Sequence, residues 1–225
     1  MSEASFVQAL ALGLDPAWRR LPTEQRCQDA VAFTEAVENA PGVTTYCYST
    51  IGLQPGADLL VWRLSPTLDA LEEAAAGALR CGLGRWLHVS ESLLGVIQPS
   101  QYVKRPTAQE QSLFSGERSR YLVVYPFTKT TDWYLLSKEA RQGVMNEHMR
   151  VGHDYPTIRQ ALAYSFGLDA QDFVVAYETD DLVAFGDLVR ALRATESRRS
   201  TVSDSPILLG IHRPIDEILT LLGAG

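Results

Sequence analysis

Hydrophobic and polar positions along the chain repeat one order of elements twice. Alternation of apolar and polar residues predicts strands, and an apolar residue at every third or fourth position predicts helices. In the first half the pattern predicts strands near Phe6–Leu14, Val43–Gly52, Asp58–Ser65 and His88–Gln98, and helices near Thr23–Asn39 and Leu68–Arg80. In the second half it predicts strands near Arg120–Thr128, Arg159–Gly167, Phe173–Thr179 and Ser205–His212, and helices near Lys138–Gly152 and Leu182–Ala194.

Two segments align without a gap, which indicates an internal duplication. Asp58–Arg80 reads DLLVWRLSPTLDALEEAAAGALR and Asp172–Ala194 reads DFVVAYETDDLVAFGDLVRALRA, at an offset of 172 − 58 = 114. Each is an apolar strand followed by a helix. Chance similarity between amphipathic units can produce such a match, but the order of the surrounding elements repeats as well, which favours duplicated architecture.

The repeated order strand, helix, strand, strand, helix, strand predicts an α+β fold made of two ferredoxin-like halves. Two such sheets either pack face to face or close into one α/β barrel with the helices outside. We expect an N-terminal half over 1–98 and a C-terminal half over 120–225. The segment between them, 99–119, is rich in Gln, Ser, Pro and Gly and predicts a loop. A short helical segment, Ile215–Leu222, follows Pro214.

Composition narrows the class of protein. A net charge of −7 argues against a general nucleic-acid or membrane-surface binder, which would carry a basic face. No apolar run approaches the length of about 18 residues that a membrane span needs. The three cysteines lack CxxC spacing, so we expect reduced thiols in a cytoplasmic protein rather than disulfides or a zinc site. They are Cys27, Cys47 and Cys81.

The helix near Lys138–Gly152 carries the first candidate site residue, His148. Ser137 is a favourable N-cap and Glu139 lies in the first turn, where the helix dipole favours an anion. His148 falls at helical spacing from Val144 on the apolar stripe. A core histidine bonded to a backbone carbonyl gives the same pattern. An uncharged imidazole in apolar surroundings is also what an axial iron ligand requires.

Two strands carry the remaining candidates. Alternation places Tyr125 and Lys129 on one face of the first strand of the second half. They could be a core aromatic residue and a solvated strand end, or a redox-active phenol beside a cation that holds a carboxylate. In the next strand Gln160 shares a face with Leu162 and Tyr164, and it could equally be a surface residue at the strand end. Arg159 should point to the opposite face.

Several short motifs surround these residues and together resemble a known family. The pattern YPFTK, WYLL, EH, YP, SFGLD, DFVVAYETDDL and LVRALR resembles the C-terminal half of the chlorite dismutase family, and especially its coproheme decarboxylase branch. The first half is similar more loosely, through YSTIGLQPGADLLVWRLSP and the YVKR segment. The resemblance runs from about Val43 to Arg213. It implies two ferredoxin-like halves in an α/β barrel, and a homo-oligomer that is commonly a pentamer.

The resemblance also implies residue roles. The histidine of the EH motif, the proximal haem ligand, falls on His148. The oxidisable tyrosine that takes hydrogen from the porphyrin propionate falls on Tyr125, and the lysine that helps to hold this propionate falls on Lys129. The segment that anchors propionates falls on Tyr102, Lys104 and Arg105. The implied substrate and cofactor is coproheme III, the product is haem b, and the oxidant is hydrogen peroxide.

The distal position separates the branches of this family. Chlorite-decomposing members have an arginine seven residues before the glycine of the xGLD motif, which here is 167 − 7 = 160, or Gln160. A neutral amide cannot hold a chlorine oxyanion as a guanidinium can, so decarboxylation is the leading hypothesis. A chlorite- or peroxide-decomposing haem enzyme, and a haem-binding or cofactor-free protein on the same fold, are the alternatives.

Overall fold

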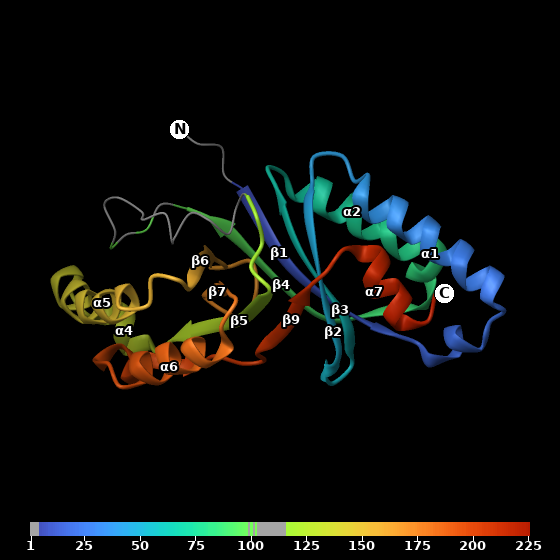
Figure 1. Cartoon of the computed structure of the whole chain (residues 1–225). Coiled ribbons are helices and arrows are strands. Elements are labelled where there is room, and N and C mark those ends of the chain that lie inside the picture. Colours follow the sequence, from blue (N-terminus) through green and yellow to red (C-terminus); the bar gives the residue numbers. More distant parts are fainter. Residues whose placement is uncertain (1–4, 99, 101, 103–115) are drawn as a thin grey trace. The chain divides into compact units, whose positions relative to one another are not determined.

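The computed structural model describes residues 5–98, 100, 102 and 116–225, which fold into two compact units (Figure 1). Unit 1 comprises Met1–Ile97 and Leu208–Gly225, and unit 2 comprises Gln98–Ile207. Of the predicted propionate-anchoring residues, Lys104 and Arg105 lie outside the described residues. No helix in the described part of the chain is both long enough and apolar enough to cross a membrane.

Unit 1 contains the first ferredoxin-like motif. Its strands are β1 (Ser5–Leu14), β2 (Thr44–Gln54), β3 (Ala57–Ser65) and β4 (Leu87–Ile97), and its main helices are α1 (Thr23–Glu38) and α2 (Leu68–Arg80). The strands lie in the antiparallel order β4-β1-β3-β2. Short 3-10 turns follow at η1 (Pro16–Arg20) and η2 (Gly82–Trp86). The predicted elements of this half are therefore present.

The core of unit 1 lies between its sheet and its helices, which Figure 1 shows side by side on one face. Alternate residues of β1 and β3, among them Leu12 and Leu59, are fully buried there with Trp18 and Phe33. The indole Nε1 of Trp18 donates a hydrogen bond of 3.1 Å to the Asp29 carboxylate. This satisfies both polar groups inside the core.

The end of the chain packs differently from the sequence expectation. Everything after residue 120 was assigned to the second half, whereas β9 (Leu208–His212) and α7 (Ile215–Leu222) belong to unit 1. β9 pairs antiparallel with β2, in the register Tyr48↔His212. The apolar stripe of α7 joins the unit 1 core through Ile215, Ile218, Leu219 and Leu222. Burial of that apolar stripe stabilises α7 against unit 1, although α7 follows unit 2 in the sequence.

Unit 2 repeats the motif. Its strands are β5 (Tyr121–Lys129), β6 (Arg159–Tyr164), β7 (Phe173–Thr179) and β8 (Thr201–Ser203), and its helices are α4 (Thr131–Leu135), α5 (Lys138–His153) and α6 (Leu182–Arg193). A 3-10 turn, η4, spans Glu196–Ser200. Strand pairing gives the order β6-β7-β5-β8, which matches that of unit 1. The predicted strand Ser205–His212 is present only as β9, and an unpredicted short strand, β8, precedes it, with Pro206, which has no amide donor, between the two.

The aligned segments occupy equivalent places in the two units. α2 begins at Leu68 and α6 at Leu182, and each is capped by the preceding residue, Thr67 or Asp181. The strand before each helix, β3 or β7, pairs with both the first and the second strand of its unit. The duplicated architecture predicted from the sequence is therefore confirmed at the level of elements, pairing order and helix caps.

Candidate functional site

His148 lies on α5, which begins as the sequence predicts. The Ser137 hydroxyl accepts a hydrogen bond of 3.2 Å from the Ala140 amide and caps the helix. α5 packs against α6 and η4, yet none of its residues is fully buried. The side chains of α5 are therefore only partly covered within unit 2.

One ring nitrogen of His148 is fixed by a neighbouring turn. Nδ1 lies 3.0 Å from the hydroxyl oxygen of Ser197, which is itself 3.0 Å from the hydroxyl of Thr195. Burial, with a smaller contribution from the Lys129 charge, lowers the pKa of His148 from 6.5 to about 4. The imidazole is therefore uncharged at neutral pH. Within the described residues its Nε2 has no hydrogen-bond partner, so this nitrogen can bind a metal.

Lys129 supports this arrangement from the end of β5. Its ammonium nitrogen donates a 3.1 Å hydrogen bond to the carbonyl oxygen of Ser197 and lies 4.3 Å from the ring centroid of Trp133. The side chain is buried, and burial lowers its pKa from 10.5 to about 8. The sequence suggested a carboxylate anchor or a solvated strand end. In this structure the ammonium group instead donates to the Ser197 carbonyl oxygen, and the Ser197 hydroxyl contacts His148.

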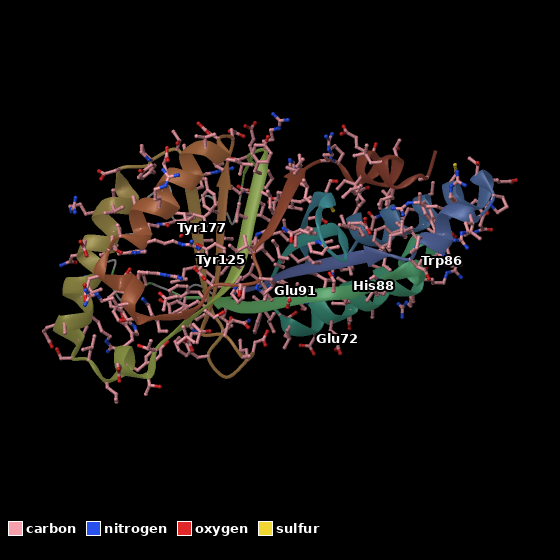
Figure 2. All side chains as sticks on the ribbon, turned by 90° about the horizontal axis from the view of Figure 1, so that it is seen from below. Glu72, Trp86, His88, Glu91, Tyr125 and Tyr177 are labelled. Atoms are coloured by element: carbon pink, nitrogen blue, oxygen red, sulfur yellow. The ribbon has the colours of Figure 1, made fainter. Side chains whose placement is uncertain are left out.

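Tyr125 lies on the same face of β5, as predicted, and meets a second tyrosine there. Its ring stacks against that of Tyr177 on β7, with centroids 6.0 Å apart and planes at 25° (Figure 2). A hydrogen bond links the Tyr125 and Tyr177 hydroxyl groups. Burial first, and then Tyr177, raises the pKa of Tyr125 well above its ordinary value. Tyr125 is therefore a neutral phenol at physiological pH.

Gln160 lies on this face of the sheet as well. The register pairs Gln160 with Tyr177, so the amide is a direct cross-strand neighbour of the tyrosine pair. Arg159 points to the opposite face, as expected, and its guanidinium forms a 2.7 Å ion pair with the buried carboxylate of Glu178. It is therefore not a cationic substitute for an arginine at the Gln160 position.

Tyr102 is the described member of the predicted propionate-anchoring set. It is half-buried, and its ring centroid lies 6.5 Å from that of Trp133, which in turn covers Lys129. Gln142 of α5 approaches the Tyr102 carbonyl oxygen at 3.5 Å. This places Tyr102 near the Lys129 end of the site. The structure gives no placement for Lys104 and Arg105.

Aromatic and aliphatic side chains on this face of the unit 2 sheet remain partly uncovered. Phe166 is 49% exposed and Leu162 is 41% exposed. Phe166 contacts Phe173 edge to face at 5.1 Å, and Phe173 contacts Phe127 at 6.1 Å. An apolar face of this size beside a neutral imidazole fits a flat macrocycle with a central metal. Arg193 and Arg198 add positive charge near Tyr125 and Lys129, and both guanidinium groups are paired with the Asp204 carboxylate.

Three residues of the site were not singled out from the sequence: Tyr177, Ser197 and Trp133. Tyr177 could have been found by alternation along Phe173–Thr179, because it shares a face with Phe173 and Val175. Ser197 lies in the short turn η4 and meets His148 only through the tertiary fold. Within the described residues no group of three or more His, Cys, Asp or Glu side chains could hold a metal ion.

Fold and site together define a class: an α+β protein of two ferredoxin-like units, of which the second carries an uncharged, hydrogen-bonded histidine and a sheet face with partly exposed apolar side chains. The family model described as chlorite dismutase matches residues 23–213, and the chain belongs to that family. Its members include haem enzymes of two kinds, coproheme decarboxylases and chlorite dismutases. The expected family and the fold class are therefore confirmed.

Individual relatives cover most of the chain. It is 28% identical over 196 residues to the coproheme decarboxylase of Mycolicibacterium smegmatis, covering 86% of this chain and 84% of that protein. It is 27% identical over 150 residues to the chlorite dismutase of Ideonella dechloratans, covering 63% and 53% respectively. The chlorite dismutase of Candidatus Nitrospira defluvii in complex with imidazole has a TM-score of 0.89 at 31% identity, covering 98% of this chain and 95% of that one.

Proposed function

We propose that this protein is a coproheme decarboxylase, which converts two propionates of coproheme III to vinyl groups with hydrogen peroxide and yields haem b. The observation that carries the proposal is the arrangement within unit 2. An uncharged histidine, fixed at Nδ1 by Ser197, lies in the same unit as a buried neutral phenol, Tyr125, which has a neutral amide, Gln160, near it. The similarity to the Mycolicibacterium smegmatis enzyme supports the same activity.

His148 would hold the iron of coproheme through Nε2. The Ser197 hydroxyl keeps the ring oriented, and burial keeps it unprotonated and able to coordinate. Lys129 fixes the carbonyl of Ser197 and so steadies the turn that holds the ring. Its role is thus proposed as positioning of the histidine, in place of the propionate contact that the resemblance implied. Tyr102, with Lys104 and Arg105, would bind propionates.

Coproheme iron with hydrogen peroxide supplies the oxidising power when both are bound. Tyr125 would lose a hydrogen atom and then take one from the propionate. Loss of a second electron from that side chain and release of carbon dioxide would leave the vinyl group. The protein contributes position, charge complementarity and exclusion of water around Tyr125. Gln160 would offer the bound group a neutral hydrogen-bonding amide, without the fixed charge that would retain chlorite.

Two further properties belong to this proposal. We propose a cytoplasmic protein, which the three free cysteines support because thiols stay reduced in the cytoplasm. We also propose a homo-oligomer, with the pentamer of related proteins as the expected form. Light scattering of the purified protein measures its mass in solution and tests this directly.

The proposal is tested with the variant Tyr125→Phe. It should bind coproheme with the wild-type Soret spectrum and form almost no haem b after peroxide is added. Tyr121→Phe is the matched control, because Tyr121 lies on the same strand and face but outside the tyrosine pair. Normal turnover by Tyr125→Phe would refute the assignment. Oxygen release from chlorite by the wild type would favour chlorite chemistry instead.

A further inference from the structure

We propose that Tyr177 is a second redox-active tyrosine, which exchanges a hydrogen atom with Tyr125 and holds the oxidising equivalent in a buried position. This inference rests on the proposed function, because Tyr125 must first be oxidised. It assigns a role in the reaction to a residue that the sequence motifs do not distinguish. It also explains why two phenols share a hydrogen bond on one face of the sheet.

Geometry places the two phenols in direct communication. Tyr125 lies on β5 and Tyr177 on the adjacent strand β7, in the diagonal position beside the register pair Val123↔Tyr177. Their rings stack with centroids 6.0 Å apart, and the hydroxyl of one bonds the oxygen of the other. A hydrogen-bonded pair of identical groups needs no chain rearrangement for a hydrogen atom to pass between the two oxygens.

The proposed step is balanced within the pair. After Tyr125 has lost its phenolic hydrogen, its radical oxygen accepts a hydrogen bond from Tyr177. The O–H bond of Tyr177 breaks as an O–H bond of Tyr125 forms, and one proton and one electron move together. Tyr177 becomes the radical and Tyr125 is again a phenol. No other oxidant or reductant is required for this exchange, and its reverse returns the radical to Tyr125.

The surroundings favour Tyr177 as a place where the radical is retained. Tyr177 is only 5% exposed, whereas Tyr125 is partly accessible. Besides Tyr125, the ring contact recorded for Tyr177 within the described residues is with Phe185 of α6, at 5.3 Å. Phenylalanine is much harder to oxidise than tyrosine, so it does not carry the radical further. A radical on Tyr177 is shielded from solvent and returns only through Tyr125.

A purely structural role is the competing explanation. A buried tyrosine hydroxyl normally has a hydrogen-bond partner, and Tyr125 could serve only to satisfy Tyr177. That role predicts a loss of stability on removal of the hydroxyl and a changed g value for a radical on Tyr125, but no change in the use of peroxide. The two explanations are therefore separated by reaction stoichiometry, whereas the g value tests the hydrogen bond between the two phenols.

The test uses Tyr177→Phe, with Tyr121→Phe as control, each loaded with coproheme III and mixed with hydrogen peroxide. High-field electron paramagnetic resonance of rapidly frozen samples reports the tyrosyl radical. A hydrogen bond to the radical oxygen lowers its largest g value, so Tyr177→Phe should shift that value upward. Haem b formed per peroxide consumed should fall about fivefold, the factor that loss of one neutral hydrogen bond of about 1 kcal/mol makes in an equilibrium.

The outcomes separate this inference from the proposed function. A wild type that decarboxylates coproheme, with Tyr177→Phe matching Tyr121→Phe in peroxide yield whatever its g value, overturns the role of Tyr177 alone. A wild type that forms neither a tyrosyl radical nor haem b overturns both the proposed function and the exchange. A shifted g value together with a lower yield in Tyr177→Phe supports the exchange.

Discussion

Without added cofactor, the protein should become less stable as the pH falls, and His148 should account for much of this loss. Its pKa is lowered from 6.5 to about 4 by burial and by Lys129. Between these two values the unfolded chain binds a proton that the folded chain does not, so stability is lost as the pH falls. From pH 7.5 to pH 5 this one group should cost about 2 kcal/mol of unfolding free energy.

The measurement is denaturant unfolding of wild type and His148→Gln at a series of pH values. Carboxylates also titrate in this range, but they are common to both proteins, so the difference between the two curves isolates the imidazole. His153→Gln is the matched control, because His153 ends the same helix and is exposed. The wild type should lose about 2 kcal/mol more than His148→Gln by pH 5, and the control should follow the wild type.

A different pH dependence of stability would contradict the role assigned to His148. If His148→Gln and wild type lose stability in parallel between pH 7.5 and pH 5, the imidazole is already solvated in the folded protein. The account of a neutral, buried ligand would then be wrong, together with the role given to Ser197 in fixing the ring. A control that behaves like His148→Gln would point to a general property of α5 instead.

Three further predictions concern residues around the site and in the unit 1 core. Between pH 8 and pH 10.5 the Lys129 ammonium group binds fewer protons in the folded chain than in the unfolded chain. The free energy of unfolding of the wild type should therefore rise with pH, by at most about 3 kcal/mol over that window. Denaturant unfolding of Lys129→Met should show no such rise. Ser197→Ala should lose about 1–3 kcal/mol in unfolding experiments, because His148 Nδ1 loses its buried partner, whereas Ser200→Ala should be nearly neutral. Gly84→Ala should lower the melting temperature, because the added Cβ would collide with the Ala78 carbonyl oxygen. Gly77→Ala should raise the melting temperature, because Gly77 lies within α2 and the added Cβ would point into open space.

Periodicity was sufficient for most of the fold, because the relevant interactions are local or repeat along the strand. The predicted bounds of α2 and of β7 agree with the structure at both ends. The five-residue helix α4 was missed, because one turn carries too little periodic signal. The placement of α7 was also missed, since the unit against which an apolar stripe is buried depends on strand pairing far away in the sequence.

The site shows a similar division. Strand alternation placed Tyr125 with Lys129 on one face of its strand and Gln160 with Leu162 on one face of the next. The β6–β7–β5 pairing brings Tyr125 and Gln160 together through Tyr177. The partner of His148 could not be predicted, because Ser197 is 49 residues away and meets it through packing of α5 on η4. Lys129 was correctly placed on its strand, but the direction of its ammonium group depends on Trp133, at the start of a helix that was not predicted.

The central claim is decarboxylation of coproheme, and the mass of the product tests it most directly. Purified protein is mixed with coproheme III and titrated with hydrogen peroxide, and the porphyrin is examined by mass spectrometry. The account predicts a product lighter than coproheme by two carbon dioxide molecules and four hydrogen atoms, as expected for two vinyl groups. A porphyrin that is bound through His148 but keeps its full mass while peroxide is consumed would contradict it.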